Sequence, residues 1–185
     1  KNKTVLVEAL RYGYLQELLY KNMVKSISKV KLLVLGDYTY KHTNLQIEIL
    51  NRALKYLPKN IDIYFKPHPN NTFDIAKYKN INFKLVTTSL DIIFSEVNIV
   101  FTSSITSSCV DAYLNGLPII SILDPTTFNQ SPLRNNKNIQ FVSSSGQLVI
   151  AINNLINNSS FNEKIDYFCF DKNLSKWLKL LEISK

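Results

Sequence analysis

The sequence predicts an α/β fold built on a mostly parallel sheet of about five or six strands. Short apolar runs alternate along the chain with segments whose apolar residues recur at helical spacing. The stretch Ile99–Leu123 shows this alternation most clearly, because an apolar run, a hydroxyl-rich turn, a helical segment ended by Gly116 and a second apolar run follow one another. This order is typical of a βαβ unit, which joins parallel strands.

The predicted strands are short apolar stretches bounded by Gly, Pro or polar residues, as expected of strands that are covered on both faces. In chain order they are Val30–Leu35, Ile61–Phe65, Phe83–Val86, Ile99–Phe101, Ile119–Ile122 and Gln140–Val142.

The predicted helices carry apolar residues at spacings of three and four. They are Thr4–Ile27 as one segment or two, Asn44–Leu57, a short Thr72–Tyr78, Ser89–Glu96, a helix capped by Ser104 and stopped by Gly116, Ser145–Ile156 and Leu174–Ile183. With 185 residues, of which 45% are hydrophobic, the chain can bury the core of one domain and carry flanking segments. We expect residues 29–160 to form that domain, residues 1–28 to be an inter-domain or N-terminal helical segment, and residues 161–185 to pack back on it.

The composition narrows the classes of partner. The net charge of +8 suits an anionic ligand, an anionic membrane surface or nucleic acid. Basic and aromatic residues are not interleaved along any element, so nucleic-acid binding is not predicted. No apolar run approaches membrane-spanning length, and two cysteines form no disulfide framework, which fits a reducing cytoplasm. Contact with the membrane surface from that compartment stays a further option.

Several well-known motifs are missing from the sequence. Two histidines and no cysteine pair at ligand spacing argue against a structural zinc site. The G-x-x-x-x-G-K-[ST] and G-x-G-x-x-G phosphate-binding fingerprints are absent, as is the G-x-S-x-G nucleophile elbow.

Three polar turns each follow a predicted strand: Gly36-Asp37, Lys66–Pro69 and Thr102–Ser108. Ligands of open parallel sheets bind beyond the carboxyl ends of the strands, so these turns predict one shared site. In the second turn, prolines restrict the backbone on both sides of His68, whose imidazole can donate to a phosphate or act as acid or base. Lys66 adds a positive charge. A proline-rich loop with a solvent-exposed histidine is the alternative.

The third turn is unusually rich in hydroxyl groups, which occupy six of its seven positions. Ser107 and Ser108 fall in the predicted first helical turn, where backbone N–H groups lack partners and an anion binds well. Asp111 lies one turn further, where it can accept from a ligand hydroxyl or simply be solvated. The alternative is that these hydroxyls only cap the helix.

Together, the K-P-H-P turn, the S-S-x-x-S-S turn and the run A-Y-L-N-G-L-P-I-I resemble the C-terminal half of GT-B glycosyltransferases. The resemblance covers roughly Val30–Leu123. It is strongest to bacterial sialyl- and polysialyltransferases, capsule Kdo transferases and surface carbohydrate (O-antigen) biosynthesis proteins. It implies a Rossmann-like three-layer α/β/α domain, one half of a GT-B fold, acting in lipopolysaccharide or capsule synthesis.

The resemblance also implies roles for residues. His68 would be the catalytic residue, contacting the donor phosphate and stabilising the leaving nucleotide. Substrate-binding residues would be Gly36, Asp37, Lys66, Ser103, Ser104, Ser107, Ser108 and Asp111. The donor would be a CMP-sugar or, as second choice, a UDP-sugar. No further cofactor is expected, and no metal, since the Asp-x-Asp pair of metal-dependent glycosyltransferases is missing.

In such enzymes the catalytic base and the acceptor site lie mainly in an N-terminal domain. We therefore expect this chain to be the donor-binding half of a larger enzyme, with a glycan or lipid-linked acceptor bound by the other half. Two alternatives stay open. One is a CDP-glycerol or CDP-ribitol phosphotransferase, although Phe101-Thr102-Ser103-Ser104 stands where Asp-Tyr-Ser-Ser is expected. The other is a non-catalytic α/β interaction domain.

Overall fold

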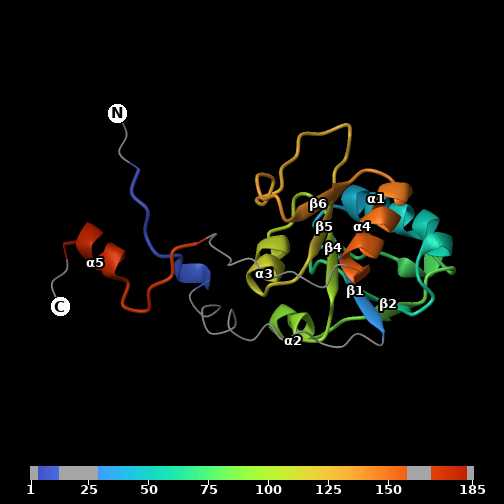
Figure 1. Ribbon diagram of the computed structural model, residues 1–185, viewed down its shortest axis with the longest axis horizontal. Helices are drawn as coiled ribbons and strands as arrows, with labels where there is room; N and C mark the ends of the chain where they lie inside the picture. Colours follow the sequence, from blue (N-terminus) through green and yellow to red (C-terminus); the bar gives the residue numbers. More distant parts are fainter. Residues whose placement is uncertain (1–3, 13–28, 158–167, 183–185) are drawn as a thin grey trace.

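In the computed structural model, which describes residues 4–12, 29–157 and 168–182, a six-stranded sheet forms the centre of the fold (Figure 1). Its strand order is β3-β2-β1-β4-β5-β6, and every neighbouring pair is parallel. The strands are β1 Val30–Leu35, β2 Ile61–Lys66, β3 Phe83–Leu85, β4 Ile99–Thr102, β5 Ile119–Ile122 and β6 Ile139–Val142. The predicted Rossmann-like α/β fold is confirmed.

The chain reverses its direction of travel across the sheet between β1 and β4. It runs outward from β1 to β3, returns to place β4 beside β1, and then continues to β6 on the other side. Leu35 at the end of β1 is in register with Lys66 of β2 and Thr102 of β4. The ends of these three strands therefore lie side by side, and the switch point between β1 and β4 is where such sheets hold ligands.

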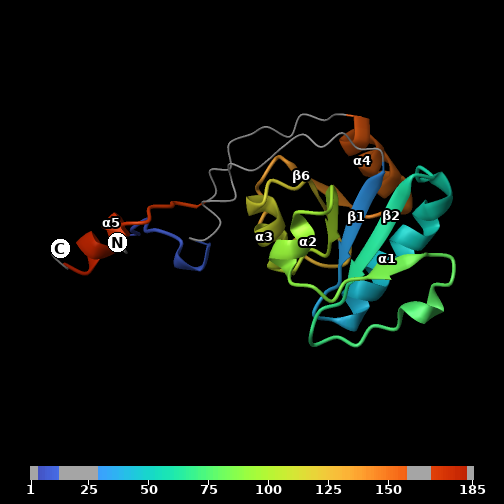
Figure 2. The same ribbon diagram turned by 90° about the horizontal axis from the view of Figure 1, so that it is seen from below.

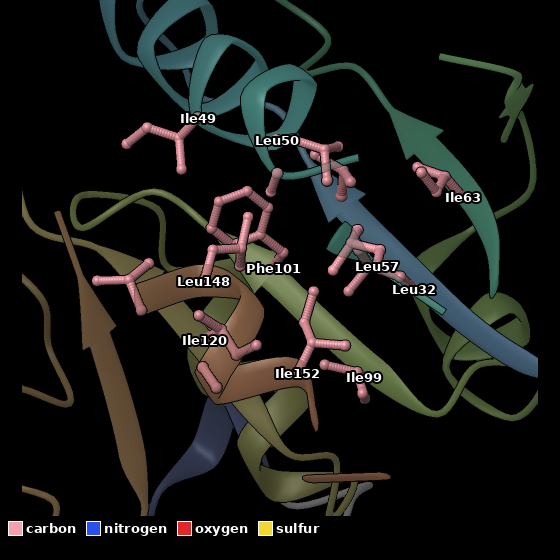
Figure 3. Close-up of a cluster of buried hydrophobic side chains, with 14 of the residues drawn as sticks. Leu32, Ile49, Leu50, Leu57, Ile63, Ile99, Phe101, Ile120, Leu148 and Ile152 are labelled. Atoms are coloured by element: carbon pink, nitrogen blue, oxygen red, sulfur yellow. The ribbon is translucent and has the colours of Figure 1, made fainter. Parts of the chain in front are cut away.

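Helices α1 (Tyr40–Ala53) and α4 (Ser145–Asn157) cover one face of the sheet. Figure 3 shows their apolar side chains meeting those of the strands, with Phe101 and Ile120 beneath Leu148 and Leu50. These four side chains are fully buried. Burying each contributes about 1.5–3 kcal/mol, which fixes both helices on this face.

Helices α2 (Leu90–Phe94) and α3 (Ser108–Leu114) cover the opposite face. The four β4 residues are all buried because helices lie on both sides of that strand. As α1 follows β1 and α3 follows β4, the loops on the two sides of the switch point turn toward opposite faces. Within the described ranges, none of the helices is long and apolar enough to cross a membrane.

Local contacts set several helix ends differently from the prediction. Helix α1 begins at Tyr40, four residues before the predicted start, because Thr39 caps it by accepting from the backbone N–H of His42. The helix predicted from Ser104 begins at Ser108, after the N-cap Ser107. The predicted helix Thr72–Tyr78 is a 3-10 turn over Ile75–Lys77, and another such turn, Leu54–Tyr56, follows α1.

The two terminal segments pack against each other at one end of the molecule, beyond α3 and away from α1 and α4 (Figures 1 and 2). The helix predicted over Thr4–Ile27 is wrong for residues 4–9, which have no regular structure, and only residues 10–12 form a 3-10 turn. Residues 13–27 lie outside the described ranges. The Ala9 N–H donates to the Cys169 carbonyl at 3.0 Å, which takes this stretch out of a helix. Helix α5 is shorter than predicted, spanning Ser175–Leu180.

Candidate functional site

The turn after β1 and the K-P-H-P turn after β2 lie in direct contact. The Gly36 N–H donates to the Lys66 carbonyl at 2.9 Å. A Cβ atom at Gly36 would stand 3.3 Å from the backbone N of His68 and 3.3 Å from the Cα of Pro67. Glycine lets the two backbones approach this closely, because a Cβ atom here would require the neighbouring backbone to shift by a few tenths of an ångström. Gly36 thus sets the position of the His68 loop.

Asn71 fastens the same loop to the first turn from the other side. Its side-chain amide donates to the Asp37 carbonyl at 2.9 Å and to the Thr43 hydroxyl at 3.2 Å. Its backbone N–H donates to the His68 carbonyl at 2.9 Å, which closes the turn. Asn71 is not among the predicted site residues, since an asparagine after a proline-rich turn carries no local signal of a contact 34 residues away.

Asp37 joins the first turn to the serine turn across the switch point. One carboxylate oxygen accepts from the Thr39 N–H at 2.7 Å and the Thr39 hydroxyl at 3.0 Å. The other accepts a short hydrogen bond from the Ser103 hydroxyl. Asp37 has no exposed surface. Its buried carboxylate therefore holds the two turns together, and a direct contact with a ligand stays a prediction.

His68 is partly buried, and its ring orientation is fixed. Its Nδ1 atom accepts from the Asn70 N–H at 3.2 Å, so in the neutral ring the proton sits on Nε2. Its ring stands edge-on to that of Tyr38, with centroids 6.0 Å apart. The exposed edge of the imidazole therefore offers an N–H, which suits an anion.

The serine turn divides into a buried and an open part. Ser103 is held by Asp37, and its carbonyl accepts from the Ser121 hydroxyl at 3.2 Å. In the described part of the chain, the backbone N–H groups of Ser104, Thr106 and Ser107 have no hydrogen-bond partner. The Ser104 hydroxyl also lacks a partner there without being sealed from solvent. These groups can receive an anion, whereas Ser103 supports them from below.

Two other predicted site residues point their charges elsewhere. The Lys66 ammonium donates to the Thr88 carbonyl at 2.6 Å, on the loop that follows β3. Burial raises the pKa of Asp111, and the nearby charge of Arg11 partly opposes this. Asp111 therefore lies near the charge of Arg11 in the N-terminal segment. Ser108 is partly exposed at the first residue of α3.

Among the residues that the structure describes, no group of three or more His, Cys, Asp or Glu side chains could hold a metal ion. Cys109 is buried in α3, and this burial raises the pKa of its thiol to about 12. It is inert as a nucleophile at neutral pH.

No protein-family model and no curated protein matches this chain. Three solved structures are similar. UDP-GlcNAc 2-epimerase from Methanocaldococcus jannaschii has a TM-score of 0.60 at 12% identity, over 92% of this chain and 50% of that protein. MurG from Acinetobacter baumannii has a TM-score of 0.55 at 11% identity, over 78% of this chain and 47% of that protein. The wall teichoic acid polymerase TagF has a TM-score of 0.51 at 18% identity, over 81% of this chain and 38% of that protein.

At these identities the likeness shows the fold alone. The chain spans half or less of the length of each of the three proteins. The Rossmann-like domain described above is thus of the kind that occurs as one half of a GT-B fold.

Proposed function

We propose that this chain is the donor-binding domain of a GT-B glycosyltransferase of bacterial surface polysaccharide synthesis. The observation that carries the proposal is the convergence of three turns at the switch point of the sheet. Gly36 touches the His68 loop, Asn71 fastens that loop to the Asp37 turn, and Asp37 binds Ser103 of the serine turn. Open hydrogen-bond donors from two of these turns then lie at the same edge of the sheet.

The donors suit the phosphate of a nucleotide-sugar. His68 Nε2–H would donate to one phosphate oxygen, and the Ser104 hydroxyl and the free N–H groups of Ser104, Thr106 and Ser107 would bind others. When the bond between sugar and phosphate breaks, negative charge grows on the leaving nucleotide. Donors that are already fixed in place stabilise this charge without reorganisation. His68 would thus be a catalytic residue.

A CMP-sugar is our first choice of donor and a UDP-sugar the second, on the resemblance of the K-P-H-P and S-S-x-x-S-S turns. The chain would bind its glycan or lipid-linked acceptor through a further domain, which fits its coverage of 47% of MurG and 50% of the epimerase. The cytoplasm, with contact at the inner membrane surface through the net charge of +8, is the proposed location.

Nucleotide titration tests the proposal. CMP, CDP, UDP and GDP are added to the wild type, His68→Ala and Ser104→Ala while backbone amide shifts are followed. We expect CMP to bind, and each substitution to weaken it roughly 10- to 100-fold, because each removes a hydrogen bond to a charged group. Ser95→Ala is the matched control, since Ser95 precedes β4 and lies at the opposite edge of the sheet.

Other outcomes distinguish the alternatives. Indifference to every nucleotide would overturn the proposal in favour of a non-catalytic interaction domain. Preference for CDP over CMP and UDP would indicate a phosphotransferase that takes a CDP-linked donor. Full transferase activity of this polypeptide alone would contradict its role as half of an active site.

A further inference from the structure

The second histidine, His42, lies in the first turn of α1, shortly after the Gly36-Asp37 turn. Its Nδ1 atom is 2.8 Å from the Thr39 hydroxyl oxygen and 3.5 Å from a carboxylate oxygen of Asp37. The three side chains form a row that leads from the buried carboxylate outward to the imidazole.

The positions of the protons in this row follow from the available donors. The Thr39 hydroxyl has one proton, and the Asp37 carboxylate 3.0 Å away can only accept. That proton therefore points to Asp37. His42 must then carry its proton on Nδ1 and donate it to the Thr39 oxygen, an arrangement that the negative charge of Asp37 also favours.

The opposite ring nitrogen, Nε2, is thereby left as an acceptor. In the described part of the chain it has no hydrogen-bond partner, and it is not among the buried unpaired atoms, so it is open to solvent. The charged groups near this side of α1 are Asp124, which follows β5, and Lys41, whose ammonium is 3.7 Å from Asp124. Lys41 already has this carboxylate as its partner.

We propose that His42 Nε2 accepts a hydrogen bond from a hydroxyl group of the nucleotide-sugar bound at the turns after β1, β2 and β4. This inference rests on the proposed function. A lone pair repels phosphate oxygens and attracts hydroxyl groups, whereas the Nε2–H of His68 does the reverse. The two histidines are thus held in opposite tautomers, one for the phosphate and one for a hydroxyl of the ribose or of the sugar.

The tautomers can be measured directly by ¹⁵N NMR of the imidazole rings at neutral pH. We expect the proton on Nδ1 in His42 and on Nε2 in His68. Thr39→Val should abolish the preference of His42, and Thr39→Ser, which keeps the hydroxyl, should preserve it. A proton on Nε2 of His42 in the wild type would overturn the inference.

Ligand titration of the same signals tests the contact. The probes are CMP, 2′,3′-dideoxy-CMP, CMP-N-acetylneuraminate, UDP-N-acetylglucosamine and inorganic phosphate. A shift of His42 Nε2 with CMP that the dideoxy analogue does not cause identifies a ribose hydroxyl, and a shift only with the two nucleotide-sugars identifies a sugar hydroxyl. Either supports the inference, and inorganic phosphate should move His68 alone.

Two failures are distinguishable in this titration. If nucleotides move His68 and never His42, the inference fails while the proposed function stands. If no probe moves either ring, both fail. In the supporting case, His42→Ala should weaken the nucleotide roughly fivefold, the cost of one neutral hydrogen bond, without weakening inorganic phosphate. His68→Ala should weaken both.

Discussion

Gly36 is the residue on which the contact between the turn after β1 and the His68 loop depends most directly. We expect Gly36→Ala to cost about 1–3 kcal/mol, because its new methyl group would press on backbone atoms of Pro67 and His68 that cannot rotate away. Gly146→Ala is the matched control, since a Cβ in this first turn of α4 would meet nothing within 4 Å. It should be neutral or stabilise by up to about 1 kcal/mol. Denaturant unfolding measures both, and equal losses would show that the approach at Gly36 is not tight.

Asp37 should be as sensitive as Gly36, for an electrostatic reason. Asp37→Asn keeps the shape but turns one acceptor into an N–H₂ group that faces a hydroxyl or N–H donor. We expect a loss of about 1–3 kcal/mol in the free energy of unfolding, because the group is fully buried. Asp62→Asn is the control. Asp62 pairs with Lys84 at 2.8 Å and Lys29 at 2.9 Å near the surface, so its substitution should cost less. A larger loss for Asp62 would contradict this ranking.

The residues that local sequence patterns predict and those that they do not predict differ in the contacts they make. Gly36, His68 and Ser104 follow strands, and a parallel sheet brings strand ends together, so their neighbourhood could be predicted. Asn71 and His42 work through contacts that no spacing reveals. Asp37 follows a strand in the same way, but its hydrogen bond with Ser103, 66 residues away, could not be anticipated from local spacing.

At the scale of elements, strands were easier to predict than helix ends. All six predicted strands are present because their apolar residues are buried by helices on both faces. Helix starts depend on which hydroxyl caps the backbone, and several candidates stand near each start. The Ser103 hydroxyl donates to Asp37 and does not cap the helix, and α3 begins only at Ser108.

Glu8 provides a prediction for the terminal segments. Its carboxylate accepts from the N–H groups of Lys176 and Trp177 at 2.9 and 3.1 Å, where α5 begins. Burial alone would raise the pKa of Glu8, but these N–H groups outweigh it and lower the pKa. The charged form is thus favoured in the folded state. Its contribution to stability is complete above the ordinary glutamate pKa of about 4.3 and is lost as pH falls through the lower pKa of the folded state.

Trp177 reports this loss, since it is the only tryptophan of the sequence and its indole N–H donates to the Glu8 carbonyl at 2.8 Å. As pH is lowered, its fluorescence should change before the circular-dichroism signal of the helices in the main domain is lost. Glu8→Ala should show the acid spectrum already at neutral pH. A Trp177 signal that is flat down to global acid unfolding would contradict the role of Glu8.

For the whole molecule, the terminal segments are more exposed than the sheet and its helices. They expose large apolar side chains, with Leu6 71% and Leu181 57% exposed, and hydrogen bonds from Ala9 and Glu8 join one segment to the other. That residues 1–28 form an inter-domain or N-terminal segment and that residues 161–185 pack back on the domain stay predictions. The inner residues of these segments still reach the main domain, since Tyr12 belongs to the buried cluster on the face covered by α2 and α3, and Phe168 packs against that cluster.

The two cysteines can show whether these parts open independently. Cys109 is 1% exposed within α3, and its raised pKa of about 12 leaves no thiolate near neutral pH until the main domain unfolds. Cys169 is partly exposed in the C-terminal segment. Because its neighbours Phe168 and Phe170 are only partly buried where they pack against the cluster on the α2–α3 face, we expect this segment to open without unfolding of the sheet. A thiol reagent should then label Cys169 at least about a thousandfold faster than Cys109, whose rate reports global unfolding.

Cys109→Ser and Cys169→Ser assign the two phases of labelling to the two thiols. Equal protection of both thiols would show instead that the terminal segments and the sheet unfold as one cooperative unit.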